Sequence, residues 1–180
     1  MSSIPAIIML LVTLSMLVYK DNYNGEGKLT DFFIEDATPG TGHILVNADP
    51  SDFTMDITNG AITGGVEGII ERNLSTPLLI EEASATPKFP SDDLTELKSQ
   101  VLSKGVSTMV VPTSLIESDE IRFSFVIDGN RFSVKNLSPI TWEKGSQYIY
   151  TIRLSGTSLT ISQVTIAKWE TELADDLIIY

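Results

Sequence analysis

Residues 147–170, QYIYTIRLSGTSLTISQVTIAKWE, carry the pattern that decides the fold of this chain. Side chains alternate between the two faces of a β-strand, so apolar residues two apart share a face. The first half shows this alternation at Tyr148, Tyr150, Ile152 and Leu154. Residues 155–158, SGTS, have the composition of a turn, and Leu159 and Ile161 then resume the alternation. The segment therefore predicts a β-hairpin.

The phase of the alternation changes in the second strand of this hairpin. Leu159 and Ile161 have odd numbers, whereas Val164 and Ile166 have even numbers, so a regular strand cannot place both pairs on one face. An extra residue in a β-bulge restores the phase. We predict an irregularity between Ser162 and Val164, and we expect all four apolar side chains to point into the core and to be buried there.

The composition limits the class of protein. A length of 180 residues suits one domain with a continuous core. The chain has 12 Lys and Arg against 24 Asp and Glu, a formal net charge of -12, which argues against binding to nucleic acid or to an anionic membrane surface. It has no cysteine, which excludes disulfides and thiolate zinc sites within it.

The apolar segment at residues 4–18 has three interpretations: a buried strand, a signal peptide and a membrane span. No Lys or Arg precedes the segment, no clear cleavage site follows it, and it is shorter than the roughly 20 residues that a span requires. The even-numbered residues are all apolar, whereas Thr13, Ser15 and Tyr19 interrupt the odd-numbered set. This alternation favours a strand.

The rest of the chain predicts short strands and one helix. Turn signals separate strand candidates at residues 28–37, 43–48, 52–58 and 64–70, and residues 120–137 predict a second hairpin around Asp-Gly-Asn. Residues 71–90 contain three prolines and predict a mobile loop with an edge segment at residues 78–80. Residues 91–105 predict an amphipathic helix with Ser or Asp as its N-cap, a possible capping box between Asp93 and Glu96, and an apolar stripe: Leu94, Leu97, Val101 and Leu102. We expect an all-β antiparallel sandwich with one short helix over residues 1–170, and a tail at residues 171–180.

Residues with catalytic chemistry are few and do not form a known pattern. His43 is the only histidine and lies at a strand start without a nucleophile motif. The adjacent acids Glu81-Glu82, Asp92-Asp93 and Asp175-Asp176 point in different directions on a strand or loop, unlike the paired carboxylates of a glycosidase. Segments at Asp49 and Asp128 lack the regular ligands of a calcium loop. The sequence predicts no enzyme, no catalytic residue, no metal site and no cofactor.

The closing stretch resembles the closing hairpin of the fimbrillin-like proteins of Bacteroidetes, which are pilus subunits and cell-adhesion proteins. The resemblance rests on an ordered set of residues: Trp142, Gly145 after Lys144, Tyr148, Tyr150, Val164, Ile166 and Trp169. It implies a transthyretin-like sandwich with Greek-key or immunoglobulin-like topology, exported to the outer membrane or fimbrium, with other fimbrial subunits as partners. Family members are often two-domain lipoproteins with a signal cysteine. We therefore expect this chain to be a C-terminal domain or to begin at an internal methionine.

Two functions follow as hypotheses. The first is a structural or adhesive subunit that assembles by strand exchange, in which the tail is a donor strand carrying Leu173, Leu177, Ile179 and Tyr180. The tail could equally pair with an edge of its own sandwich. The alternative is a glycan-binding module, in which Trp142, Tyr148 or Trp169 stack on sugar rings instead of packing in the core. A host protein or glycan is then a further partner.

Overall fold

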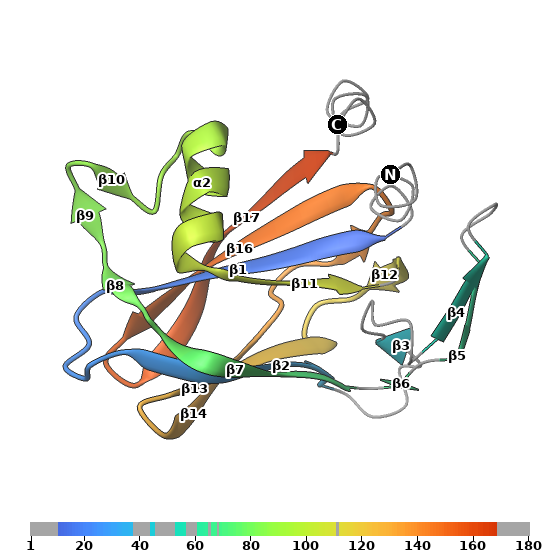
Figure 1. Cartoon of the computed structure of the whole chain (residues 1–180), viewed down its shortest axis with the longest axis horizontal. Coiled ribbons are helices and arrows are strands. Elements are labelled where there is room, and N and C mark those ends of the chain that lie inside the picture. The colour runs from blue at the N-terminus through green and yellow to red at the C-terminus, as the bar shows by residue number, and fades with distance from the viewer. Residues whose placement is uncertain are drawn as a thin grey trace.

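Two β-sheets pack face to face in the computed structural model, which describes residues 11–37, 44–45, 53–56, 61–64, 66–67, 69–110 and 112–168 (Figure 1). The first sheet has the order β11 (Val106–Val110), β1 (Val12–Lys20), β16 (Ser146–Ser155) and β17 (Ser158–Lys168), with β8 (Glu81–Glu82) also paired to β1. The second has the order β14 (Asn130–Lys135), β13 (Ile121–Ile127), β2 (Lys28–Asp36) and β7 (Ile69–Leu79). The predicted all-β sandwich is confirmed.

Four two-stranded ladders and a helix complete the described elements. The ladders pair β3 (Ile44–Leu45) with β6 (Val66–Glu67), β4 (Phe53–Asp56) with β5 (Ala61–Gly64), β9 (Ser84–Ala85) with β10 (Lys88–Phe89), and β12 (Thr113–Ile116) with β15 (Ile140–Trp142). Helix α2 (Leu94–Lys104) lies on the outer face of the first sheet (Figure 1). The ladders are antiparallel except that β1 runs parallel to β16 and to β8, a difference from the predicted antiparallel sandwich.

Strand β1 is covered on both faces. Its even-numbered residues join the main core between the sheets: Val12, Leu14, Met16 and Val18. Leu17 and Tyr19 point the other way, into a second cluster with Phe89, Leu97 and Val101. A strand that is buried on both faces reads as an almost continuous apolar run, as parallel-paired strands often do. The strand interpretation is confirmed for residues 12–20, while residues 4–10 lie outside the described residues. Within the described ranges, no helix is long and apolar enough to cross a membrane.

Helix α2 begins and ends where the sequence predicts. The Asp93 carboxylate accepts a hydrogen bond from the Glu96 N–H at 3.0 Å, which satisfies one of the free donors at the helix start. Leu97 and Val101 are buried against the sheet. The predicted stripe is wrong at its two ends, because Leu94 and Leu102 are exposed and Gln100 is buried in their place. Gln100 is tolerated there because its side chain binds Ser91 N and Lys88 O.

Residues 71–79 form a strand instead of the predicted loop. Strand β7 pairs with β2, but between Asn73 and Leu78 it carries four residues where β2 carries only Thr30. Pro77 falls in this out-of-register stretch on an edge strand, so its missing N–H removes no ladder hydrogen bond. Sequence reasoning therefore overestimated the disruption that proline causes.

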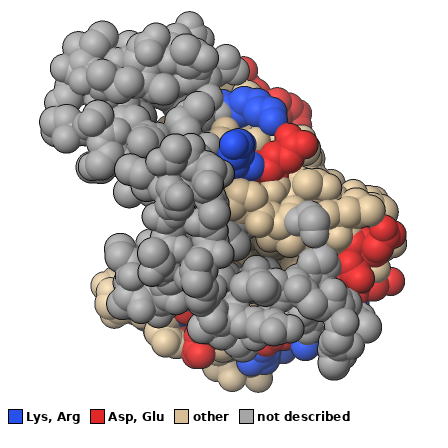
Figure 2. Space-filling model, turned by 90° about the vertical axis from the view of Figure 1, so that its right-hand side faces the viewer, with Lys and Arg blue, Asp and Glu red and all other residues tan. Residues whose placement is uncertain are grey.

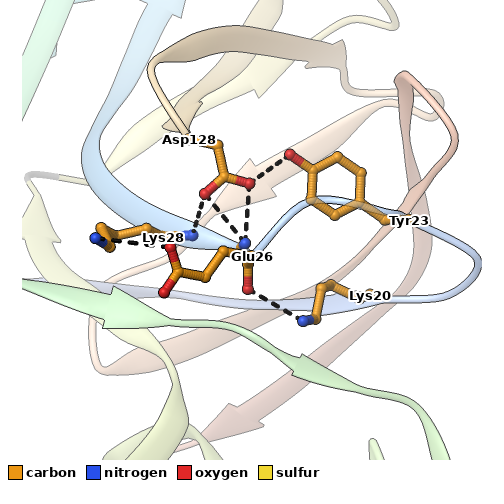
Figure 3. Close-up of polar contacts among 6 residues, drawn as sticks. Lys20, Tyr23, Glu26, Lys28 and Asp128 are labelled. Atoms are coloured by element: carbon orange, nitrogen blue, oxygen red, sulfur yellow. Dashed lines mark hydrogen bonds and ion pairs between the residues drawn. The ribbon is translucent and has the colours of Figure 1, made fainter.

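The turn after β13 holds the loop between β1 and β2 in place (Figure 3). Asp128 and Gly129 have φ angles of 53° and 81°, as the predicted Asp-Gly turn requires. The Asp128 carboxylate accepts hydrogen bonds from Gly27 N, from Lys28 N and, at 2.6 Å, from the Tyr23 hydroxyl. This contact raises the pKa of Tyr23 to about 12 and lowers the pKa of Asp128. Asp128 is thus a structural hydrogen-bond acceptor.

Candidate functional site: an apolar groove at the edge of the sandwich

The predicted β-bulge lies in strand β17. Thr151 pairs with Gln163 and Ile152 pairs with Ile161, so Ser162 is the extra residue. Before the bulge, Leu159 pairs with Leu154. After it, Val164 pairs with Tyr150 and Ile166 with Tyr148, and these partners belong to the main core. Directly opposed side chains share a face, so the prediction of a phase-restoring bulge is confirmed.

The expectation that all four apolar residues are buried is wrong for the second pair. Leu159 is buried and Ile161 is half-buried, but Val164 is 39% exposed and Ile166 is 54% exposed. These two side chains point to the core side of the sheet at a place where the opposite sheet does not cover them. Strand β17 is the last strand of its sheet, and the residues that line the groove with Val164 and Ile166 from the other side come from the segment after β14 and not from β14 itself.

A groove of 370 Å³ fills this uncovered corner. Its walls are β17 and the segment at residues 136–140, which connects β14 to β15. Leu137 on that segment is 65% exposed and faces the same space as Val164 and Ile166. Among the described residues, β17 pairs only with β16, so its outer backbone groups are available to another strand.

Asn136 fixes the wall of the groove. Its buried side chain accepts a hydrogen bond from Ile121 N at 2.9 Å and donates one to Glu117 O at 2.9 Å. The backbone at this point is therefore held against β13, and Leu137 projects from it. Sequence reasoning missed Leu137, because an apolar residue in the turn-like stretch Asn-Leu-Ser-Pro resembles the end of a strand.

The aromatic residues of the closing stretch lie in the core beside the groove. Trp142, Tyr148 and Tyr150 are fully buried in the main core. The Trp142 indole N–H donates to the Tyr150 hydroxyl at 3.0 Å, and burial raises the pKa of Tyr150. The Tyr148 hydroxyl donates to Thr141 O at 2.7 Å and accepts from Glu143 N at 2.8 Å. The Tyr-x-Tyr pattern thus anchors β15 to β16.

Two further contacts complete this end of the molecule. Gly145 has a φ of 73°, which favours glycine, and its N–H donates to Leu11 O at 2.8 Å. Lys168 at the end of β17 donates to the Glu143 carboxylate at 3.0 Å, and this exposed hydrogen bond raises the pKa of Lys168. Figure 2 shows one face of the molecule, where Lys and Arg side chains (blue) lie next to Asp and Glu side chains (red) and uncharged residues (tan) surround them.

The opposite edge of the sandwich is closed by a polar contact. Arg72 on β7 reaches across to β11 in the other sheet, where its guanidinium donates to the Thr108 hydroxyl from Nε at 3.2 Å and from Nη2 at 2.9 Å. The two long edges therefore differ: Arg72 bridges one, while the β14 and β17 side has an apolar opening.

The other predicted residues have mixed outcomes. Glu81 and Glu82 are exposed on β8, and Asp93 caps α2. His43, Trp169, Asp49, Asp175 and Asp176, as well as the donor-strand candidates Leu173, Leu177, Ile179 and Tyr180, lie outside the described residues. No group of three or more potential metal ligands occurs in the described part of the chain. Trp142 and Tyr148 offer no exposed ring to a sugar, which corrects the aromatic platform of the glycan hypothesis.

Comparisons with known proteins found a matching family model and similar solved structures. A family model described as fimbrillin-like matches residues 28–169. A solved structure from Bacteroides ovatus ATCC 8483, described as a "putative cell adhesion protein", is 12% identical with a TM-score of 0.51, over 89% of this chain and 46% of that chain. One from Bacteroides uniformis ATCC 8492 with the same description is 15% identical with a TM-score of 0.47, over 89% and 51%. The chain thus spans about half the length of these structures. No curated protein matches it.

Proposed function

Since the chain belongs to the fimbrillin-like family, we propose that it is a non-enzymatic structural or adhesive subunit of a bacterial surface fimbria, assembled by β-strand exchange. The observation that carries the assembly step is the groove beside β17, with Val164, Ile166 and Leu137 exposed in it. An added strand would cover these side chains and pair with the outer edge of β17. Export to the cell surface is part of the same proposal.

The tail of a neighbouring subunit is the occupant that this groove fits best. Leu177 and Ile179 are two residues apart, as are Val164 and Ile166, so both pairs have the spacing of side chains on one face of a strand. Cross-strand contacts between the two pairs would bury apolar surface that β17 leaves in water.

The direction of the chain favours a neighbour over the molecule's own tail. Strand β17 ends at Lys168, just beyond Ile166, so a strand that continues in the same direction leaves the groove. The tail of the same molecule enters the groove only after a reversal of direction. A tail from another copy meets no such constraint, and its acids keep it soluble before assembly.

The experiment compares the full chain with a chain lacking residues 174–180. We expect the full chain to form head-to-tail oligomers in light scattering and electron microscopy, and the truncated chain to remain a monomer with an unchanged melting temperature. A synthetic peptide of residues 170–180 should bind the truncated chain and shift the NMR signals of Val164, Ile166 and Leu137. The matched control is the same peptide with L177D and I179D, which should not bind.

Two results would contradict the proposal. A large loss of monomer stability on truncation would show that the tail is an internal strand. Failure of the peptide to shift the groove signals would show that the groove accepts something else. Surface display is tested separately, by antibody labelling of intact cells, where labelling only after permeabilisation would contradict export.

A further inference from the structure

A second cavity, of 430 Å³, lies on the other face of the first sheet. Three neighbouring strands supply its floor, through Tyr19 on β1, Thr151 on β16 and Gln163 on β17. Residues 83–92, which include the β9–β10 hairpin, form its wall. The volume falls in the range of roughly 300–1,000 Å³ that is typical of pockets for small molecules.

The bulge of β17 shapes the floor of this cavity. Thr151 faces Gln163 across the ladder, and the extra residue Ser162 precedes Gln163. The Ser162 hydroxyl donates to Thr151 O at 3.0 Å and accepts from the Tyr19 hydroxyl at 3.4 Å. Two consecutive polar side chains therefore line the same cavity, which a regular strand cannot provide because its side chains alternate. Bulges commonly redirect side chains at functional sites.

Two largely buried aromatic side chains, Tyr19 at 8% and Phe89 at 5% exposed, form an apolar corner of the cavity lining. The Tyr19 and Phe89 rings meet edge to face, with centroids 6.4 Å apart and an interplanar angle of 77°. Pro90 lines the cavity beside them. The ring of Phe89 is held from behind by the second cluster under α2 and by Lys104, whose ammonium lies 4.7 Å from the ring centroid. These contacts support the Phe89 ring on the side away from the cavity.

Polar groups of both signs surround this apolar corner. The carboxylates of Asp21 and Asp92, the ammonium of Lys88 and the amide of Gln163 all line the cavity. Their existing ion pairs are long and exposed: Asp92 to Lys88 is 3.9 Å, and Asp21 to Arg153 is 3.4 Å. Such pairs contribute little and can exchange for hydrogen bonds to a ligand.

We propose that this cavity binds a sugar residue of a neutral glycan. A sugar residue carries several hydroxyls that both donate and accept, which matches the acidic, basic and amide residues of the lining, and its C–H groups can contact Pro90 and the small exposed parts of Tyr19 and Phe89. The two carboxylates disfavour a polyanion such as a nucleotide, and Lys88 disfavours a cationic ligand. The cavity and the groove for assembly meet at β17, where Ser162 and Gln163 line both, while the residue 83–92 wall belongs to the cavity alone and the residue 136–140 wall to the groove alone.

Single-site binding of this kind is weak, because the cavity is open and much of the ligand keeps contact with water. A polymer presents many copies and converts weak sites into strong adhesion through avidity. This last step rests on the proposed fimbrial function, whereas the binding site itself does not.

The experiment titrates the full chain, labelled with ¹⁵N and ¹³C-methyl groups, with single methyl glycosides: galactoside, glucoside, mannoside, fucoside and N-acetylglucosaminide. We expect at least one to shift the signals of the Ala83 and Ala85 methyl groups, which line this cavity and not the groove. The variants Gln163→Ala and Asp92→Asn should each lower the affinity for that glycoside about tenfold, because each removes a hydrogen bond to it. The hydrogen bond of Asp92 is charge-assisted. Thr160→Ala, also exposed on β17 but outside the cavity, is the matched control and should bind like the unmodified chain.

The outcomes separate this proposal from the assembly proposal. Absence of shifts with every glycoside at tens of millimolar would overturn the sugar site, as would binding that is unchanged in both variants. The chain lacking residues 174–180 should bind the glycoside normally even though it does not assemble. If the full chain binds the glycoside but does not assemble, the assembly proposal fails. If it assembles but binds no glycoside, the sugar-site proposal fails.

Discussion

Single residues with several partners hold the loops of this sandwich in place. The Asp128 carboxylate accepts hydrogen bonds from two backbone N–H groups and from the Tyr23 hydroxyl, and so joins the β1–β2 loop to the β13–β14 turn (Figure 3). Trp142 and Tyr150 have a comparable role in the core, where an indole N–H finds a phenol oxygen instead of remaining unsatisfied.

Replacing Asp128 by Asn should lower the free energy of unfolding by about 1–2 kcal/mol, because an amide cannot accept all three hydrogen bonds. Asn tolerates the positive φ at this position, so the change isolates the hydrogen bonds. Urea denaturation measures the effect. Asp119→Asn, at another aspartate with positive φ, serves as control and should change stability by less than about 0.5 kcal/mol.

The same contact predicts a dependence on alkaline pH. The pKa of Tyr23 is raised from 10.0 to about 12, so between these values the folded state keeps a proton that the unfolded state loses. The contribution of the Tyr23 contact to folding stability is present below pH 10 and should be lost as the pH rises to about 12. The unmodified chain should therefore lose more stability than Tyr23→Phe over this range. Equal losses in the two proteins would refute the link.

Trp142→Ala should lower the free energy of unfolding by about 3–5 kcal/mol, because it leaves a large cavity in the main core. Trp142→Phe keeps most of the ring but loses the hydrogen bond to Tyr150, and it should cost less. Denaturation followed by circular dichroism measures both. A cost for the alanine variant below about 1 kcal/mol would show that the indole is not a core residue.

At the scale of elements, an apolar residue contributes to stability only where a neighbouring helix or strand covers its side chain. Helix α2 and strand β17 each carry apolar residues that the pattern alone treats as equivalent. Leu97 is buried under α2 whereas Leu102 is 88% exposed, and Leu159 is buried on β17 whereas Ile166 is exposed. The difference arises from neighbouring elements that are distant in sequence.

Helix α2 provides a direct test with one kind of substitution. Leu97→Ala should lower the free energy of unfolding by about 2–4 kcal/mol, because its side chain fills the cluster with Leu17, Tyr19 and Ile149. Leu102→Ala should change it by less than about 0.5 kcal/mol. Thermal and urea denaturation of the pair measure the contrast. Similar costs for both would mean that Leu102 has a packing partner.

At the scale of the whole molecule, the two long edges of the sandwich have different roles. Arg72 bridges the β7 and β11 edge, whereas the β14 and β17 edge is open beside the groove. Strand β1 begins and β17 ends at the same end of the first sheet, because Val12 pairs with Ser146 and Ser146 pairs with Lys168 (Figure 1).

The open edge predicts the effect of a charge in the groove. Ile166→Lys should abolish association of the full chain, since a lysine there would be desolvated without a partner when a donor strand binds. Monomer stability should change by less than about 1 kcal/mol, because Ile166 is already 54% exposed. Analytical ultracentrifugation measures association. Thr160→Lys, on the other face of β17, should associate normally, and equal association of both variants would exclude the groove.

The sequence by itself determined most of the core strands, the two hairpins, the bulge in β17 and the position of α2, because these depend on neighbours along the chain. Period-two alternation, the Asp-Gly and Ser-Gly-Thr-Ser turns, and the Ser and Asp residues before the helix are local signals. Only the tertiary structure decided that β1 lies parallel to β16, that β7 tolerates Pro77 as an edge strand, and that Leu137 joins Val164 and Ile166 in a groove. These features depend on which segments meet across the two sheets, and alternation along one strand shows which residues share a face but not what covers that face.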